Sequence, residues 1–315
     1  MKISVVIPSK NGLHHLKECL PTVVEAVKNS INPVNITVVD DCSDDNTSAE
    51  FSSLFPTVKY LRTTPENNGA CNARNIGVKA TECDWICFLD NDVFLETEFF
   101  NTAIKYLRDD VFAVTCCGYT AYPAIKGIQE QNDGIKLFDW KRGYPRFTGN
   151  IKNEDLDLNK EYECLGAQGA YFFMSRKWFD ALGGFDELFS PYLLEETDLV
   201  YRGLKRGGKI IYANDTQPRH KCGGTIQSRT SPKTKYLSKR NRILFVWKNI
   251  HDNKLLLSNI LWTILRPCPK AIYECVKLLP EILKRRRAEK KLIQINDLEL
   301  LKKSNEIIKH LKKDK

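Results

Sequence analysis

The chain has 315 residues, 42% of them hydrophobic, which is enough apolar content to bury the core of one large or two smaller domains. Charged residues at 28% and aromatic residues at 10% are ordinary globular values, and they exclude a disordered or low-complexity protein. The net charge of +9 is uneven, because residues 233–315 hold 22 Lys/Arg against 8 Asp/Glu whereas residues 1–232 hold 26 against 31.

Short apolar runs alternate with longer amphipathic segments over the first 117 residues. The runs predict buried strands and the amphipathic segments predict helices between them. The predicted strands are Ile3–Ile7, Ile36–Val39, Val58–Leu61, Trp85–Leu89 and Val111–Cys116. The predicted helices are Leu13–Lys28, Thr47–Leu54, Ala70–Ala80 and Glu96–Leu107. Continuous apolar strands separated by helices indicate an α/β fold, with a Rossmann-like, mostly parallel, doubly wound sheet.

Residues 118–163 break this rhythm. They are rich in Gly, Tyr, Pro and Asn, and such a segment inside a regular domain predicts a long functional loop. Regular structure is expected again at Ala170–Met174, Arg176–Leu182, Glu196–Lys205 and Lys209–Tyr212.

Beyond Pro232 the chain is predicted to form a helical extension. The predicted helices are Lys235–Asn249, Leu255–Leu265, Ala271–Lys291 and Leu298–Lys312. The longest apolar stretch, Leu255–Leu265, is far shorter than the roughly 20 residues that a membrane-spanning helix needs. The N-terminus does not have the pattern of a signal peptide, and the eleven cysteines form no Cys-x-x-Cys pair. We therefore expect a cytoplasmic protein with reduced thiols.

The basic C-terminal region suggests a partner of opposite charge. A nucleic-acid-binding protein would carry its positive charge across the body, so no nucleic-acid partner is expected. An anionic membrane surface met through residues 233–315 fits better. Its apolar faces would be Leu278, Leu279, Ile282 and Leu283 beside the basic run 284–287, and the upstream stretch Leu255–Leu265 with Trp262. The protein would then be peripheral at the inner face of the cytoplasmic membrane. The alternative is that these helices pack on protein, including as a homodimer contact.

Polar residues follow three of the predicted strands, at residues 8–12, 40–47 and 90–92. Each cluster alone is equally well explained as turn or capping chemistry. Together they gather at the carboxyl edge of a parallel sheet, where ligands bind. Asp90 and Asp92 offer hard oxygen ligands suited to Mg²⁺ or Mn²⁺. Asp40 ends an apolar strand, where its carboxylate can accept a hydrogen bond from a nucleoside.

The order and spacing of several motifs over roughly residues 1–245 resemble family 2 glycosyltransferases, which have a nucleotide-diphospho-sugar (GT-A) fold. The motifs are Val5–Asn11, Val38–Thr47, Asn68–Gly77, Phe88–Asp92, Gly183–Glu187, Glu195–Leu199 with Arg202, and His220. The chain has no Gly-x-Gly-x-x-Gly and no Walker lysine loop, which argues against NAD and ATP folds.

The resemblance implies a donor site and a metal site. Asp40 would bind the base of the nucleotide, near Pro8, Ser9 and Asn11, and Arg74 would meet the base or the diphosphate. Asp90 would sit at the ribose and the metal, Asp92 would be the direct metal ligand, and His220 would reach the metal or the diphosphate. Neutral imidazole is a reasonable ligand beside carboxylates, although His220 between Arg219 and Lys221 is alternatively a surface histidine.

The resemblance also implies a base and an acceptor site. The family commonly has an aspartate as base where this chain has Glu196, so Glu196 is the predicted general base. Its rivals are Glu195, also a candidate acceptor residue, and Asp198, which is alternatively paired with Arg202 four residues along a helix. Gly169 and Ala170 resemble the segment that lines the acceptor site, although a plain turn explains them equally well. Trp140 and Tyr144 are candidate sugar-stacking platforms.

The prediction is therefore a metal-dependent, inverting glycosyltransferase with a UDP-sugar, or dTDP-rhamnose, as donor. The acceptor would be a hydroxyl of a glycan or lipid-linked glycan in surface polysaccharide synthesis. Residues 1–232 would form the GT-A domain, with a nucleotide-sugar half (1–117) and an acceptor half (118–232), and residues 233–315 the basic helical region. The alternatives are a nucleotidyltransferase, whose glycine- and lysine-bearing loop is missing here, and a non-catalytic basic membrane-binding protein with a degenerate core.

Overall fold

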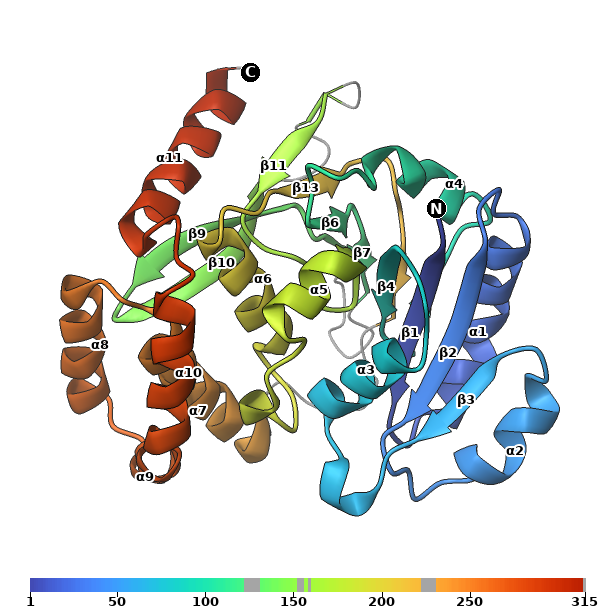
Figure 1. Ribbon diagram of the computed structural model, residues 1–315, viewed down its shortest axis with the longest axis horizontal. Coiled ribbons are helices and arrows are strands. Elements are labelled where there is room, and N and C mark those ends of the chain that lie inside the picture. Colours follow the sequence, from blue (N-terminus) through green and yellow to red (C-terminus); the bar gives the residue numbers. More distant parts are fainter. Residues whose placement is uncertain (122–130, 152–155, 158–159, 222–230, 314–315) are drawn as a thin grey trace.

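The computed structural model describes residues 1–121, 131–151, 156–157, 160–221 and 231–313. An eight-stranded sheet forms its centre, in the order β11-β13-β6-β12-β4-β1-β2-β3 (Figure 1). Strand β12 runs antiparallel to both of its neighbours and the edge strand β11 runs antiparallel to β13, while the other neighbouring pairs are parallel. The strands are β1 (Ile3–Ser9), β2 (Val34–Asp40), β3 (Lys59–Arg62), β4 (Trp85–Leu89), β6 (Ala113–Cys116), β11 (Tyr162–Cys164), β12 (Tyr171–Ser175) and β13 (Ile210–Ala213). The predicted α/β fold class is confirmed.

Both faces of the central strands are buried, which explains why their sequences are continuously apolar. In β1, Val5 and Ile7 join one hydrophobic cluster while Val6 joins the other. Four helices lie between the strands of the first half: α1 (Leu13–Lys28), α2 (Thr47–Leu54), α3 (Ala70–Lys79) and α4 (Phe99–Ala103). The helix predicted over 96–107 is shorter than expected, since α4 passes into a 3₁₀ turn at Ile104–Tyr106.

The segment predicted to be an irregular loop contains a regular β-hairpin, so that prediction is wrong in part. Strands β9 (Ile135–Lys141) and β10 (Tyr144–Ile151) pair antiparallel through a two-residue turn. Arg142 and Gly143 form that turn with φ of 54° and 75°, the left-handed backbone that such tight hairpins require. A second, smaller sheet of two-residue strands has the order β5-β14-β7-β8. These strands are β5 (Val93–Phe94), β7 (Tyr119–Thr120), β8 (Gln131–Asn132) and β14 (Arg219–His220).

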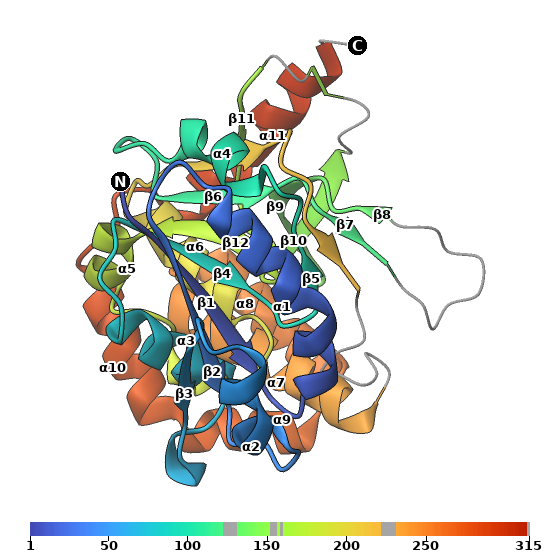
Figure 2. The same cartoon turned by 90° about the vertical axis from the view of Figure 1, so that its right-hand side faces the viewer.

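The C-terminal helices lie at the opposite end of the molecule from α1 and α2 (Figures 1 and 2). The helices after β12 are α5 (Arg176–Leu182), α6 (Glu195–Lys205), α7 (Pro232–Asn249), α8 (Asn253–Leu265), α9 (Pro269–Lys277), α10 (Leu279–Lys290) and α11 (Asp297–Lys313). The single helix predicted over 271–291 is two helices, because the chain breaks at Leu278 and α10 begins with Pro280 in its first turn.

The C-terminal region packs on the second half of the sheet and shares its core. Phe245, Cys275 and Leu300 belong to the same buried cluster as Phe172 of β12. A buried ion pair joins Lys205 to Asp297, the first residue of α11. The division at residues 232 and 233 stays a prediction about the organisation of the sequence. Among the described residues, no helix is both long and apolar enough to cross a membrane.

Candidate active site

The acidic pair lies directly after β4, at the edge where the parallel strands end. The backbone N–H of Asp90 donates to the carbonyl of Ala170 at 2.9 Å, which fixes the start of this turn beside β12. Asn91 donates from Nδ2 to Oγ of Ser9 at 2.8 Å. Asp92 is only 3% exposed, while the side chain of Asp90 is 33% exposed, so the pair joins a buried carboxylate to one that a ligand can reach.

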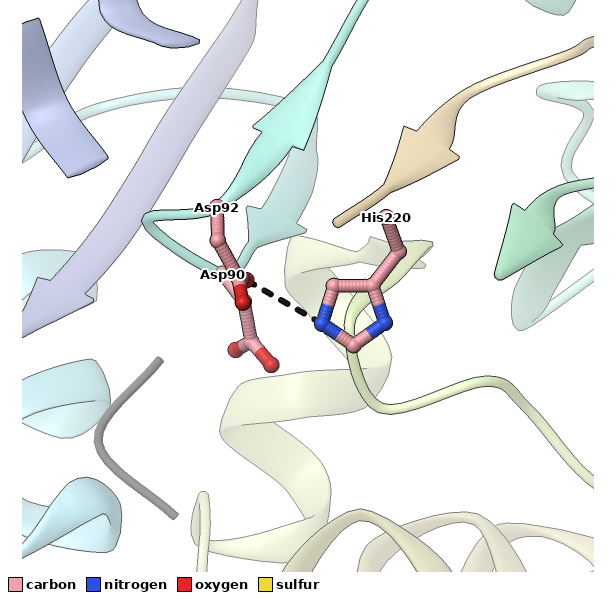
Figure 3. Close-up of side chains that lie close together, drawn as sticks. All are labelled: Asp90, Asp92 and His220. Carbon is pink, nitrogen blue, oxygen red and sulfur yellow. Dashed lines mark ion pairs between the residues drawn. The ribbon is translucent and has the colours of Figure 1, made fainter. Parts of the chain in front are cut away.

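His220 reaches the acidic pair through the small sheet (Figure 3). Strand β14 pairs antiparallel with β5, which places His220 opposite Val93, the residue after Asp92. Nε2 of His220 lies 3.1 Å from Oδ1 of Asp92. One ligand atom from each of Asp90, Asp92 and His220 lies within 4.8 Å of the others. The three residues that the sequence predicts as metal ligands therefore come together from two distant segments.

This donor set fits a divalent cation that prefers oxygen and imidazole ligands, such as Mn²⁺ or Mg²⁺. Burial raises the pKa of Asp90, as does the neighbouring Asp92, although Arg74 opposes both. Burial lowers the pKa of His220, but the hydrogen bond to Asp92 and the carboxylate charges outweigh it and leave the pKa raised. Negative charge thus accumulates here beyond what Arg74 balances, as expected of a cation site.

Arg74 on α3 connects the acidic pair to helix α6. Its Nη2 donates to Oδ1 of Asp90 at 2.8 Å, and its Nη1 donates to Oε1 of Glu195 at 2.9 Å. Arg74 and Glu195 are 5% and 6% exposed, and the other carboxylate oxygen of Glu195 has no hydrogen-bond partner among the described residues. Glu195, predicted near the acceptor, is therefore held at its Oε1 by Arg74.

Glu196 is the second residue of α6, where the N-terminal end of the helix dipole favours a carboxylate. Burial raises the pKa of Glu196, and the adjacent Glu195 charge raises it further. Gly169 lies against its side chain, because a Cβ built on Gly169 would be 3.1 Å from Cδ of Glu196. Since Gly169 precedes Ala170, whose carbonyl binds the N–H of Asp90, the predicted base and metal site occupy one region.

The predicted nucleotide residues meet at the ends of β1 and β2. Ser9 and Asp40 are register partners on these strands, and Pro8 precedes Ser9. Asn11 accepts from the N–H of Asp44 at 2.7 Å, which holds the loop after β1 to the loop after β2.

Asp40 is fully buried. Its oxygens accept hydrogen bonds from the N–H of Ser43 at 3.0 Å and the hydroxyl of Tyr60 at 2.8 Å. Arg62 lies 3.3 Å from the same carboxylate. A nucleoside would therefore reach Asp40 only if one of these contacts opened. Tyr60 and Arg62 carry no signal in the sequence beyond their place on the neighbouring strand.

Asp198, the rival candidate base, is fully buried in an ion-pair network. Its carboxylate accepts from Arg202 at 2.9 Å, from Lys248 at 2.5 Å and from Asn249 at 2.7 Å. The predicted pairing with Arg202 is present. Because Lys248 and Asn249 belong to α7, these contacts mean that Asp198 holds α7 against α6. Lys248 also contacts Asp186 at 2.8 Å.

Other side chains that the sequence did not single out surround His220. Asp133 accepts hydrogen bonds from Thr120 at 2.8 Å and from the hydroxyl of Tyr171. The ring of Tyr171 packs edge-on to His220 with 6.5 Å between ring centroids. By contrast, Trp140 and Tyr144 contact helix α8, so the sugar-stacking prediction for these two aromatic residues is not supported.

Comparison with known proteins identifies the family. Residues 4–183, more than half of the chain, match the model described as Glycosyl transferase family 2. The chain belongs to glycosyl transferase family 2. The predicted family is thus confirmed, and with it the prediction of a glycosyltransferase at the level of the family.

The curated relatives are distant. Polypeptide N-acetylgalactosaminyltransferase 10 of Rattus norvegicus is 25% identical over 217 residues, which are 66% of this chain and 35% of that protein. Glycosyltransferase GlyA of Streptococcus pneumoniae is 27% identical over 131 residues, 40% of this chain and 18% of that protein. This family 2 chain therefore spans about a third or less of the length of these relatives.

Solved structures share the GT-A fold. GalNAc-T7 with UDP, GalNAc and Mn²⁺ has a TM-score of 0.60 at 17% identity, covering 79% of this chain and 48% of that one. S. aureus TarS 1–349 with UDP-GlcNAc has a TM-score of 0.53 at 15% identity, and the match covers 93% of this chain and 84% of that one. The mannosyltransferase PcManGT of Pyrobaculum calidifontis with GDP-Man and Mn²⁺ has a TM-score of 0.54 at 15% identity, and the match covers 92% of this chain and 83% of that one.

Proposed function

We propose that this family 2 chain transfers a sugar from a nucleotide-diphosphate donor to an acceptor hydroxyl, with inversion and with a divalent cation. The observation that carries the proposal is the cluster of Asp90, Asp92 and His220, whose ligand atoms lie within 4.8 Å of one another at the carboxyl edge of the sheet. Solved structures of the same fold that contain Mn²⁺ with UDP or GDP-Man support this assignment.

Asp92, Asp90 and His220 would hold the cation, which when bound offsets the charge of the leaving diphosphate. Arg74 is positioned to hold Asp90 and Glu195 in place while the donor binds. It also adds a positive charge to the anionic site.

Glu196 would act as the general base. A carboxylate with a raised pKa is a stronger proton acceptor near neutral pH than an ordinary glutamate. It would take the proton of the acceptor hydroxyl as that oxygen attacks the anomeric carbon on the side opposite the leaving diphosphate. Gly169 leaves the space that the longer glutamate side chain occupies.

The donor proposed is a UDP-sugar, with dTDP-rhamnose as the alternative, bound by Pro8, Ser9, Asn11 and Asp40. UDP-GlcNAc bound to TarS and UDP bound to GalNAc-T7 support the uridine nucleotide. The acceptor proposed is a glycan or lipid-linked glycan of surface polysaccharide synthesis. Its binding site would be lined by Gly169, Ala170 and Glu195. We also propose that the protein is cytoplasmic, that it attaches peripherally to the membrane, and that it can form a homodimer.

Release of the nucleoside diphosphate from a panel of UDP-, dTDP- and GDP-sugars tests this proposal. We expect release in the presence of Mn²⁺ or Mg²⁺, loss with EDTA, and recovery when the cation is added back. Pyrophosphate release from a sugar 1-phosphate and a nucleoside triphosphate would instead indicate a nucleotidyltransferase. Release from no sugar nucleotide, with intact fold, would contradict the proposal.

A further inference from the structure

Helix α8 buries two polar side chains and one leucine against the protein. The residues it buries are Leu255, Asn259 and Thr263. Asn259 donates from Nδ2 to the carbonyl of Gly143 at 2.8 Å, and the Thr263 hydroxyl lies 3.0 Å from that of Tyr144. Polar contacts to the β9–β10 hairpin turn therefore attach this helix to the body.

The opposite face of α8 is apolar and exposed. Its residues follow the spacing i, i+3, i+4, i+7 and i+8, which places them on one stripe of the helix. They are Leu257 (66% exposed), Ile260 (50%), Leu261 (56%), Ile264 (68%) and Leu265 (60%). A water-facing helix normally has the reverse arrangement, and a contiguous exposed apolar patch marks a surface that meets another apolar phase.

Basic residues accompany this stripe. Lys254 lies on the same face, three residues before Leu257, while Arg266 follows the helix and Lys270 is in the first turn of α9. All three are exposed. From residue 253 to residue 273 the sequence contains no Asp or Glu.

An apolar groove continues the stripe toward α9. It has a volume of about 360 Å³ and is lined by Trp247, Ile260, Thr263, Ile264, Pro267 and Ile272. Such a groove adjoining an exposed apolar stripe provides space for an acyl chain, which a flat helix surface would not.

We propose that the exposed face of α8 docks on an anionic lipid bilayer, with α8 lying in the interface and Lys254, Arg266 and Lys270 contacting the headgroups. A second copy of the chain fits less well. Self-association through this face would bring the basic residues of both copies together, with no acidic residue of 253–273 to pair with them. The inference is independent of the sugar-transfer proposal, since it uses no residue of that site.

The sequence predicts this surface from two apolar stretches, of which Leu255–Leu265 in α8 has an exposed apolar face whereas the one beside the basic run packs on protein. In α10, Ile282 is fully buried and Leu283 half-buried, so the predicted apolar face packs on protein. Arg285 contacts Asp186 at 2.8 Å, and Arg286 donates to the carbonyls of Trp247 and Ile250. Two of the four residues of the predicted basic run, Arg285 and Arg286, therefore bind groups of the protein itself.

Sedimentation of the full chain with vesicles tests the proposal. Vesicles of phosphatidylcholine alone are compared with vesicles that also contain phosphatidylglycerol, at low and high salt. We expect binding only to the anionic vesicles, weakened by salt. The triple variant Leu257→Gln, Leu261→Gln, Ile264→Gln should lower the partition coefficient by about tenfold or more, because its apolar contacts with the acyl region are lost.

The matched control is Ile31→Gln, Leu54→Gln, Leu292→Gln, three exposed apolar residues outside this surface. It should bind vesicles as the wild type does, and circular dichroism should show both variants folded. The proposal is overturned if the full chain ignores anionic vesicles, or if the α8 variant and the control bind equally. It is also overturned if the chain is a dimer that the α8 variant converts to a monomer without any vesicle binding.

Discussion

Arg74 and Glu195, 121 residues apart in the chain, form a buried hydrogen-bonded ion pair at 2.9 Å. The same guanidinium holds Asp90 at 2.8 Å, so one side chain ties the acidic turn after β4 to the helix that carries Glu196. The two chemical parts of the proposed reaction, cation binding and proton removal, are therefore positioned by a common residue.

Glu196→Gln tests the general base. Removing a general base lowers the rate by about 10²–10⁴-fold, so we expect kcat to fall in this range. Affinity for the nucleoside diphosphate should stay near that of the wild type, because Glu196 has no assigned contact with the nucleotide. Steady-state kinetics and nucleotide titration measure the two quantities, with Glu187→Gln, on an exposed residue, as control. Equal losses of rate and of nucleotide affinity would show that Glu196 is not the base.

The pH dependence of kcat gives a second test of the same residue. The base acts when ionised, and the pKa of Glu196 is raised above the usual 4.5 by burial and by Glu195. Activity should therefore fall as the pH is lowered through the raised pKa, so that the acid limb of the profile lies above pH 4.5. The measurement uses saturating concentrations of donor and acceptor, so that changes in substrate binding with pH do not affect the rate. The residual activity of Glu196→Gln should lack this limb, and an unchanged limb would assign it to another group.

Gly169→Ala tests the contact between Gly169 and the base. The added Cβ would lie 3.1 Å from Cγ and Cδ of Glu196, so the Glu196 side chain must move slightly, by a few tenths of an ångström. A displacement of about 1 Å can cost up to about 100-fold in rate, so we expect this smaller shift to lower kcat by roughly several-fold, with little change in Tm. Combining Gly169→Ala with Glu196→Asp, whose side chain is one methylene shorter, should be less harmful than the two single effects multiplied. Strict multiplicativity would show that the two residues act independently.

Asp198→Asn tests the structural assignment of that carboxylate. Burial raises the pKa of Asp198, but the Lys248 and Arg202 charges outweigh this and hold it below the usual value. Its ionisation therefore contributes stability that is present above pH 3.8 and lost as the pH falls further. Breaking such a buried pair costs about 3 kcal/mol or more, which denaturant unfolding measures at neutral pH.

Asp180→Asn is the matched control for this change. Asp180 pairs with Arg176 at 2.9 Å on an exposed helix surface, where an ion pair contributes at most about 1 kcal/mol. If Asp198→Asn leaves stability unchanged and abolishes turnover, Asp198 would have to be reconsidered as the base.

The strand-end residues of the site could be predicted because their positions follow from local pattern. Asp90 and Asp92 directly follow an apolar strand, and parallel strands end at one edge. The partners of these residues could not be predicted. His220 comes to Asp92 only through the pairing of two-residue strands, and Arg74 meets Glu195 only when α3 and α6 pack. The burial of Asp92, which is 3% exposed, also does not follow from the local pattern, because residues after a strand end usually face solvent.

Two features of the second half could not be fully predicted from local sequence patterns. The β9–β10 hairpin turns at Arg142-Gly143, whereas the usual sequence signal for this turn is Asn-Gly or Asp-Gly. Helix α8 is predicted correctly, and its apolar stretch is a candidate for the membrane interface, but the sequence pattern alone leaves open whether the apolar stripe faces a membrane or packs on protein. The burial of Leu255 and the hydrogen bonds of Asn259 and Thr263 to the hairpin show which side of α8 faces the protein.

Calorimetric titration of UDP into the wild type and into Asp92→Asn, with and without Mn²⁺, tests the central claim most directly. The substitution keeps the size of the buried side chain and removes its charge. We expect Mn²⁺ to increase the affinity of the wild type for UDP by about tenfold or more, since a cation shared with the phosphates joins both partners, and to have little effect on the variant. Equal UDP affinity with and without Mn²⁺ in the wild type would contradict the assignment of Asp90, Asp92 and His220 as a cation site for the donor.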